Sequence, residues 1–170
     1  MPTLQDLFVT GLVNLHAVEK QALAIIALQI ARLEHYPEVA DRLRLHRDET
    51  DAQIARLDEI LAGFETSGSF LKDTALSMSG GMAAIGHSIA GDEILKNSFA
   101  NYAFEHFEIA SYTSLFTLAE DGGFTDATAL LQQSLSEEQS MAQWLGDALP
   151  RITRQYATLY TEQGAFTAKI

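Results

Sequence analysis

Four glutamates occupy helix positions whose neighbours one and two turns away are mostly apolar, and such carboxylates are the groups in this sequence best suited to chemistry. Around Glu19 these neighbours are Leu12, Leu15, Leu23 and Ile26. A carboxylate in an apolar stripe is costly to bury unless a charged partner or a metal ion compensates it. The other glutamates in comparable settings are Glu49, Glu108 and Glu138.

The spacing of the four glutamates is regular. Glu19 and Glu49 are 30 residues apart, as are Glu108 and Glu138, and the second pair follows the first at an offset of 89. Each lies roughly 13–17 residues from the tip of its predicted hairpin, so a rise of about 1.5 Å per residue brings all four near one level of a bundle. The pattern is a weak internal repeat that indicates a shared site.

Four carboxylates in a core of low dielectric constant would repel one another, and most would have to bind a proton with a strongly raised pKa. Two divalent metal ions would balance this charge. Helical bundles hold such a pair with one Glu from each of two helices and a Glu-x-x-His motif from each of the other two. Oxygen-rich sites with some imidazole suit iron or manganese. We therefore predict two bound divalent ions, with iron preferred and manganese or zinc as alternatives.

The chain departs from this template because it contains no Glu-x-x-His motif. It has the reversed order His-x-x-Glu twice and Glu-x-x-Glu once, and residues three apart share a helix face. The additional candidates, each three residues before one of the glutamates, are His16, His46 and Glu105. They are interpreted as further ligands or as groups beside the ligands, and a surface position is the alternative for both histidines.

Three nearby residues have other predicted roles. Tyr112 stands one turn after Glu108, as a core residue or as a phenol hydrogen-bonded to a ligand. Glu137 precedes Glu138 and is expected to point to another face. Arg42 belongs to a run of charges that is typical of a solvated helix surface.

Helical hairpins must position these side chains. Apolar residues recur at helical spacing over residues 4–34, His35-Tyr36-Pro37 interrupts the pattern, and Pro37 is placed to open a second helix to about Gly63. A second hairpin of similar size follows a segment rich in small residues. The predicted organisation is one domain with hairpins at about 4–63 and 92–146, a crossover at 64–91, and a C-terminal helix and tail at 147–170.

The ends of the later helices carry their own signals. Gly122-Gly123 should end the third helix, and Thr125 or Asp126 should cap the start of the fourth. Pro150 should open a separate last helix that ends near Tyr160. The remaining residues are expected to be a frayed tail or an arm docked on a partner chain. The fold class predicted is an all-α antiparallel four-helix bundle, with extra short helices in the crossover and at the C-terminus.

Composition excludes several functions. The net charge is −12, with 11 basic and 23 acidic residues, which argues against nucleic acid as a partner. The absence of cysteine excludes disulfides and thiolate metal sites. No signal peptide is visible, and no apolar run approaches the roughly 18 residues that a membrane span requires. A cytoplasmic location without membrane association is therefore expected.

Five stretches carry a resemblance to a known family: Leu4-Gln5-Asp6-Leu7-Phe8, Ala17-Val18-Glu19-Lys20-Gln21, His46-Arg47-Asp48-Glu49-Thr50, Glu105-His106-Phe107-Glu108-Ile109-Ala110-Ser111-Tyr112 and Leu135-Ser136-Glu137-Glu138. Together they resemble the YciF/YciE-like branch of the ferritin-like superfamily, from Leu4 to about Leu149. The resemblance implies a ferritin-like bundle, usually dimeric, with a di-iron-type site and an association with bacterial stress responses. It implies core ligands at Glu19, Glu49, Glu108 and Glu138, with Glu105 and His46 close by.

The chain differs from the family pattern at three positions. Gln53 replaces a histidine, Ala142 replaces an acidic residue, and His16 stands where relatives often carry tyrosine. These changes would weaken the site, leave one metal position half-occupied, or reshape the site around His16.

Three functions follow as hypotheses. The first is a stress-associated protein with a dinuclear iron or manganese site that reduces O2 or H2O2, as a ferroxidase or a peroxidase does. The alternative is a degenerate, metal-free bundle that acts as a dimeric structural or partner-binding module. The third, weaker reading is an iron-storage cage. For the first two a homodimer is expected, and the sequence carries no sign of the shell that a cage would need.

Overall fold

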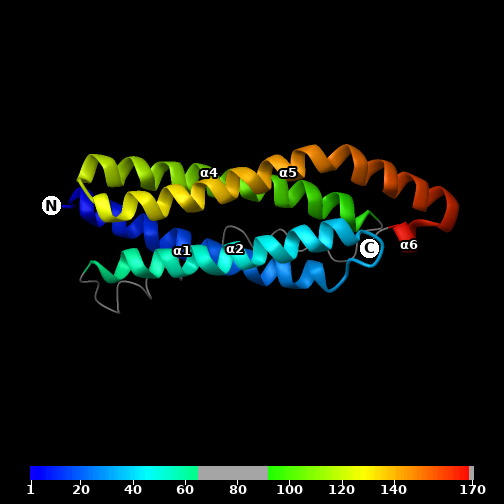
Figure 1. Cartoon of the computed structure of the whole chain (residues 1–170), viewed down its shortest axis with the longest axis horizontal. Helices are drawn as coiled ribbons and strands as arrows, with labels where there is room; N and C mark the ends of the chain where they lie inside the picture. The colour runs from blue at the N-terminus through cyan, green and yellow to red at the C-terminus, as the bar shows by residue number, and fades with distance from the viewer. Residues whose placement is uncertain (65–91, 169–170) are drawn as a thin grey trace.

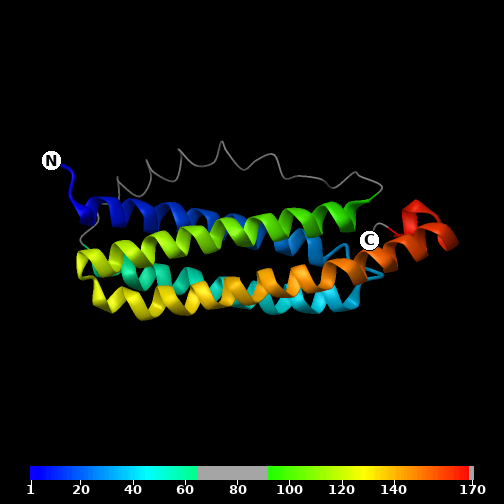
Figure 2. The same ribbon diagram turned by 90° about the horizontal axis from the view of Figure 1, so that it is seen from above.

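A computed structural model describes residues 1–64 and 92–168, and these residues form an all-α fold. The helices are α1 (Leu4–Ile30), α2 (Pro37–Ala62), α4 (Glu93–Gly122), α5 (Thr125–Gln163) and the short α6 (Ala165–Ala168). Figures 1 and 2 show two antiparallel hairpins, α1 with α2 and α4 with α5, side by side in one elongated four-helix bundle. The predicted fold class is confirmed, and the helices expected in the crossover lie outside the described residues.

The first hairpin begins with a capping box, in which the Thr3 side chain accepts from the Asp6 amide and Asp6 accepts in return from the Thr3 amide. The helix ends at Ile30, four residues before the predicted end. Pro37 occupies the first turn of α2 as predicted, where a missing amide hydrogen costs nothing.

The core lies between the four long helices. Helix α1 packs against α2 and α4, and α5 packs against α4 and α2, so each helix has two neighbours around the bundle. Gly11 permits a close approach of α1 to α4, because a Cβ there would lie 2.7 Å from Leu115 Cδ2. At one end of the bundle Phe8 stacks on Phe124, with ring centroids 4.8 Å apart, and Phe64 meets both rings edge-on.

The turn between α4 and α5 shows one confirmed prediction and one wrong one. Gly123 ends α4 in the left-handed conformation, with φ of 69°, as the glycine pair predicted. Neither Thr125 nor Asp126 caps α5, because the helix begins at Thr125 and the preceding Phe124 makes no side-chain cap. The stacking of Phe124 on Phe8 fixes the turn instead.

The predicted helix break at Pro150 is wrong. Helix α5 runs through Pro150 to Gln163 as one element of 39 residues. Proline removes one hydrogen bond from the ladder, but Ala148 and Ile152 on either side are buried in the core and keep the helix on the bundle. The tail docks on its own chain, since the hydroxyl of Tyr36 donates to the carbonyl of the buried Ala168 at 2.6 Å.

Among the described helices, α1 is long and apolar enough to cross a membrane by length and composition alone, contrary to the prediction. The core helix of a soluble protein passes the same test. In this structure Leu12, Leu15 and Glu19 of α1 are all buried in the bundle.

We predict that Gly123→Ala destabilises the protein by about 1–2 kcal/mol, because an L-residue is strained in the left-handed region. No atom lies within 4 Å of the position of the new Cβ, so the backbone conformation alone causes the loss. Chemical denaturation should show it. Gly123→Asn is the control and should lose less, since asparagine tolerates this conformation; equal losses for the two variants would contradict the explanation.

Candidate metal centre

Five ionisable side chains from all four long helices converge inside the bundle. They are at most 4% exposed, and they are Glu19, His46, Glu105, Glu108 and Glu138. Three of the four glutamates predicted from the spacing are among them, with two of the three additional candidates. The glutamates of α1 and α5 point into the bundle because the helix faces that carry them also carry buried leucines. These leucines are Leu12 and Leu15 on α1, and Leu131 and Leu135 on α5.

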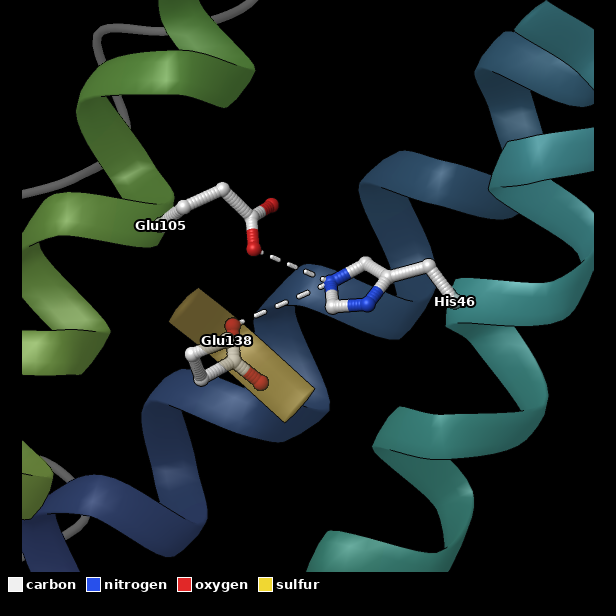
Figure 3. Close-up of side chains that lie close together, drawn as sticks. All are labelled: His46, Glu105 and Glu138. Carbon is white, nitrogen blue, oxygen red and sulfur yellow. Dashed lines mark ion pairs between the residues drawn. The ribbon is translucent and has the colours of Figure 1, made fainter. Parts of the chain in front are cut away.

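His46 lies at the centre of the charged group. Its Nδ1 is 3.1 Å from Glu49 Oε2, and its Nε2 is 3.3 Å from Glu105 Oε2 and 3.9 Å from Glu138 Oε2. Figure 3 shows the imidazole of α2 pointing toward the carboxylates of Glu105 and Glu138. One ligand atom from each of these three residues lies within 4.8 Å of the others, so the three could hold a metal ion.

The carboxylates determine the charge of His46. Burial disfavours the imidazolium, but hydrogen bonding to Glu105 and Glu49 and the charges of Glu105 and Glu138 outweigh it and raise the pKa of His46 to about 10. A divalent metal ion would take the place of this proton if the imidazole served as a ligand.

Glu19 meets a phenol in the core. Tyr112 is fully buried, and its hydroxyl donates to Glu19 Oε1 at 2.6 Å. Both predicted roles of Tyr112 are seen, because it is a core residue and its hydroxyl is hydrogen-bonded to a candidate ligand. Burial raises the pKa of Glu19 to about 7, although the bond from Tyr112 opposes the shift. Burial, and then the charge of Glu19, raise the pKa of Tyr112.

Two more core carboxylates, Glu108 and Glu138, are also held in an environment that disfavours their charge. Burial raises the pKa of Glu108, and the charges of Glu19 and Glu138 raise it further. Burial, followed by the charge of Glu105, likewise raises the pKa of Glu138. Among the described residues, Glu19 Oε2, Glu108 Oε1 and Glu138 Oε2 are buried without a hydrogen-bond partner.

Glu49 differs from the other predicted ligands, because its side chain is 22% exposed. Arg42 donates to Glu49 Oε2 at 3.0 Å and is itself only 11% exposed, so Arg42 does not lie on a solvated face as predicted. Burial opposes the charge of Glu49, but hydrogen bonds from His46 and Arg42 outweigh it and lower its pKa. The structure places Glu49 at the edge of the group, on the far side of His46 from Glu105.

The structure does not bring His16 into this group. Its Nε2 lies 3.0 Å from Oδ1 of Asp58, which is largely exposed on α2. Burial, and then the charge of Lys20, lower the pKa of His16. His16 thus faces α2 near the surface, and it does not occupy a ligand position emptied by Gln53 or Ala142.

A hydrogen-bonded network that the sequence did not predict supports Glu138. Gln53 Nε2 donates to Glu138 Oε1 at 2.5 Å and to Glu137 Oε2 at 3.1 Å. Arg56 donates to Glu137 and, at 3.0 Å, to Ser134. Glu137 therefore faces α2, contrary to the prediction that it points elsewhere. The spacing of Gln53 and Arg56, three residues apart on one helix face, was the available signal.

The donor set fits divalent metal ions. Four buried carboxylates face one buried imidazole, and the oxygens without partners require a positive charge or protons. Carboxylate oxygens with one imidazole nitrogen are the donors that iron and manganese take in oxygen-rich sites. A site of this kind could bind a metal, bring it into contact with a small oxidant, and exclude bulk water.

Comparisons with known proteins agree with the fold. A family model, described as a domain of unknown function (DUF892), matches residues 3–158. Protein YciF of Escherichia coli is 31% identical over 147 residues, which cover 82% of this chain and 86% of YciF.

Two crystal structures show the same architecture. One, of a protein from Xanthomonas campestris, is 28% identical with a TM-score of 0.75, and the match covers 94% of this chain and 99% of that one. The other, of the E. coli stress protein YciF, is 27% identical with a TM-score of 0.69 and covers 88% and 96% respectively. The resemblance proposed from the sequence is thereby confirmed.

We predict that the chelator-treated protein is less stable at pH 8 than at pH 5. Between pH 4.5 and 7 folded Glu19 keeps a proton that the unfolded chain has released, so stability falls as pH rises. Glu108, Glu138 and His46 act in the same direction, since their folded pKa values are also raised. Glu19 alone contributes on the order of 2–3 kcal/mol, or roughly 5–10 °C in Tm.

Thermal melts of two variants test this assignment. Glu19→Gln keeps an acceptor for Tyr112 and should flatten the decline, whereas Glu59→Gln on the exposed face of α2 should not. Stability that is constant or rises from pH 5 to pH 8 in the metal-free protein would be inconsistent with protonated core carboxylates.

Proposed function

The chain belongs to the DUF892 family, and from that premise we propose that it is a YciF-like bacterial stress protein whose bundle binds two divalent metal ions, iron in the first instance, and uses them to reduce O2 or H2O2. One observation supports this proposal above the others. The core holds four carboxylates, and the His46 imidazole lies within ion-pair distance of two of them, Glu105 and Glu138. Among the described residues, Glu19, Glu108 and Glu138 each keep a buried oxygen without a hydrogen-bond partner.

The residues divide into ligands and supports. Glu19, Glu105, Glu108, Glu138 and His46 would hold the metals, with Glu49 at the edge. When bound, two ferrous ions supply two electrons, which with two protons reduce O2 to H2O2, or H2O2 to two waters.

The supports hold the ligands in place. Tyr112 orients Glu19 through its hydroxyl, and Gln53 orients Glu138 through its amide. Arg42 holds Glu49 beside His46 at the edge of the site. The apolar faces around the site exclude bulk water, which strengthens every charge interaction inside it.

A metal-free structural module is the second candidate, and Gln53 is the observation that favours it. The family resemblance implies a histidine at this position, and glutamine supplies no imidazole nitrogen. The Gln53 amide instead donates to Glu138 Oε1, which occupies one carboxylate oxygen. The carboxylates around His46 would then be protonated and form a polar core. The bundle would act as a structural module that forms a homodimer or binds a larger partner complex.

We expect a homodimer under either candidate function. Helices α1 and α4 carry large exposed apolar side chains, including Leu7 at 56% and Phe107 at 44%, beside a groove of about 420 Å³ between the helices. Exposed apolar side chains that gather on one face mark association surfaces in soluble proteins. Light scattering of the intact chain should give twice the monomer mass of 18.6 kDa, and a monomer or a large cage would contradict the dimer.

We predict that protein reconstituted with Fe(II) or Mn(II) under anaerobic conditions binds about two metal ions per chain. The double variant Glu19→Gln, Glu108→Gln should bind at least about tenfold more weakly, because two anionic ligands become neutral. Elemental analysis after desalting measures both. Glu59→Gln is the control for the loss of one exposed charge and should bind as the wild type does.

The same double variant separates the two candidates. If the bundle binds metal, the variant loses the stabilisation that added Fe(II) or Mn(II) gives the wild type. If the core is degenerate, the variant is more stable than the wild type and metal affects neither, since like charges have been relieved. A content below about 0.2 metal per chain after reconstitution would reject the metal-binding proposal.

A further inference from the structure

A small apolar cavity opens beside the candidate metal centre. Its volume is about 20 Å³, and its lining includes Ala22, Ile26, Leu43, Asn101 and Glu105. A cavity needs roughly 10–15 Å³ to hold one water-sized molecule, so this one has room for a single small molecule. All but two of its lining residues are apolar, and one of those two is the candidate ligand Glu105.

The position of the cavity follows from the helix register. Ala22 lies three residues after Glu19 on α1, and Leu43 lies three residues before His46 on α2. Asn101 lies four residues before Glu105 on α4. Because α1 runs antiparallel to α2 and α4 (Figure 1), all three offsets lead toward the same end of the bundle. The cavity therefore lies one helical turn from the carboxylates.

The cavity also leads outward. Ile25 and Ala100 line it and are only partly buried, whereas Ala22, Leu43 and Glu105 are buried. It thus extends from the α1–α4 surface to the buried edge of Glu105. Asn101 is the other polar residue in the lining, and its side-chain amide is engaged with Gln29 in two reciprocal hydrogen bonds of 2.8 and 3.0 Å.

We propose that this cavity is a binding site for molecular oxygen and the route by which O2 reaches Glu105. The Glu105 carboxylate lies at the inner end of the cavity, with Oε2 3.3 Å from the His46 imidazole. The rest of the lining is apolar apart from one amide that is engaged with Gln29, so it offers little to water or H2O2, which need several hydrogen bonds. O2 is small and apolar, so it loses almost no hydrogen bonding when it leaves water, and it gains dispersion contacts with the alkyl walls. This inference rests on the proposed function and narrows its oxidant to O2.

Oxygen itself is the probe for binding. The full chain without added metal is labelled at the alanine, isoleucine and leucine methyl groups and pressurised with O2, which is paramagnetic. Methyl groups of Ala22, Ile26 and Leu43 should relax at least about threefold faster than those of Leu12 and Leu131, which are as deeply buried but outside the cavity. Equal relaxation at both sets, or an ordered water contacting Ala22 in a crystal structure, would overturn the proposal.

Two variants test the route. Ala22→Val fills the cavity, and Ala24→Val makes the same change on the exposed face of α1. Ala22→Val should abolish the excess relaxation at Leu43. In Fe(II)-loaded protein it should slow oxidation by O2 at least about fivefold and change oxidation by H2O2 less than about twofold. Ala24→Val should match the wild type in each measurement.

The outcomes separate this inference from the proposed function. If the chain binds no metal, the relaxation experiment still decides whether the cavity takes O2. If metal binds but Ala22→Val slows oxidation by both oxidants equally, or by neither, the cavity is not an oxygen route and the metal centre stands.

Discussion

Burying four carboxylates at one level of a helical bundle is the constraint on which the rest of this structure depends. Glu19, Glu105, Glu108 and Glu138 are each almost completely removed from solvent, and His46 brings a positive charge to Glu105 and Glu138. Isolated charges in such surroundings cost several kcal/mol each, so they must gain protons, partners or metal ions. The raised pKa values of Glu19, Glu108 and Glu138 show that the protein alone supplies only part of that compensation.

The surrounding structure offsets part of the cost of burying these carboxylates and fixes their positions. Two hairpins of similar length bring the glutamates to one level, and the aromatic contacts of Phe8 with Phe124 and Phe64 close the end of the bundle. Around the carboxylates, Tyr112 donates a hydrogen bond to Glu19 and Gln53 donates one to Glu138. Arg42 donates to Glu49 at the edge of the group. Residues that approach from different helices in this way fix the carboxylates before any metal arrives, which lowers the cost of binding one.

The sequence was sufficient to predict the hairpins and several of the buried carboxylates, because both depend on helical periodicity. Glu19, Glu108 and Glu138 lie on stripes whose apolar neighbours are buried, and the pattern identifies such stripes. Periodicity could not predict which of Glu49 and Glu105 is the more deeply buried. Each is three residues from another candidate on the same face, and only the packing shows that Glu105 is inside and Glu49 is at the edge beside Arg42.

Other features required the tertiary structure. His16 is three residues from Glu19, yet its partner is Asp58 on the neighbouring helix, which no local pattern indicates. Pro150 satisfies every local rule for a helix break, but the buried Ala148 and Ile152 beside it outweigh one lost hydrogen bond. Glu137 was expected on another face, and it instead meets Gln53 and Arg56 across the α2–α5 contact.

The most direct test of the metal centre is a crystal structure of the full chain grown with Mn(II), with anomalous data collected on both sides of the manganese absorption edge. Binding by the core carboxylates predicts two anomalous peaks inside the bundle, in contact with the group formed by Glu19, His46, Glu105, Glu108 and Glu138. A map with no peak there, or with peaks only at acidic residues on the surface, would contradict the central claim.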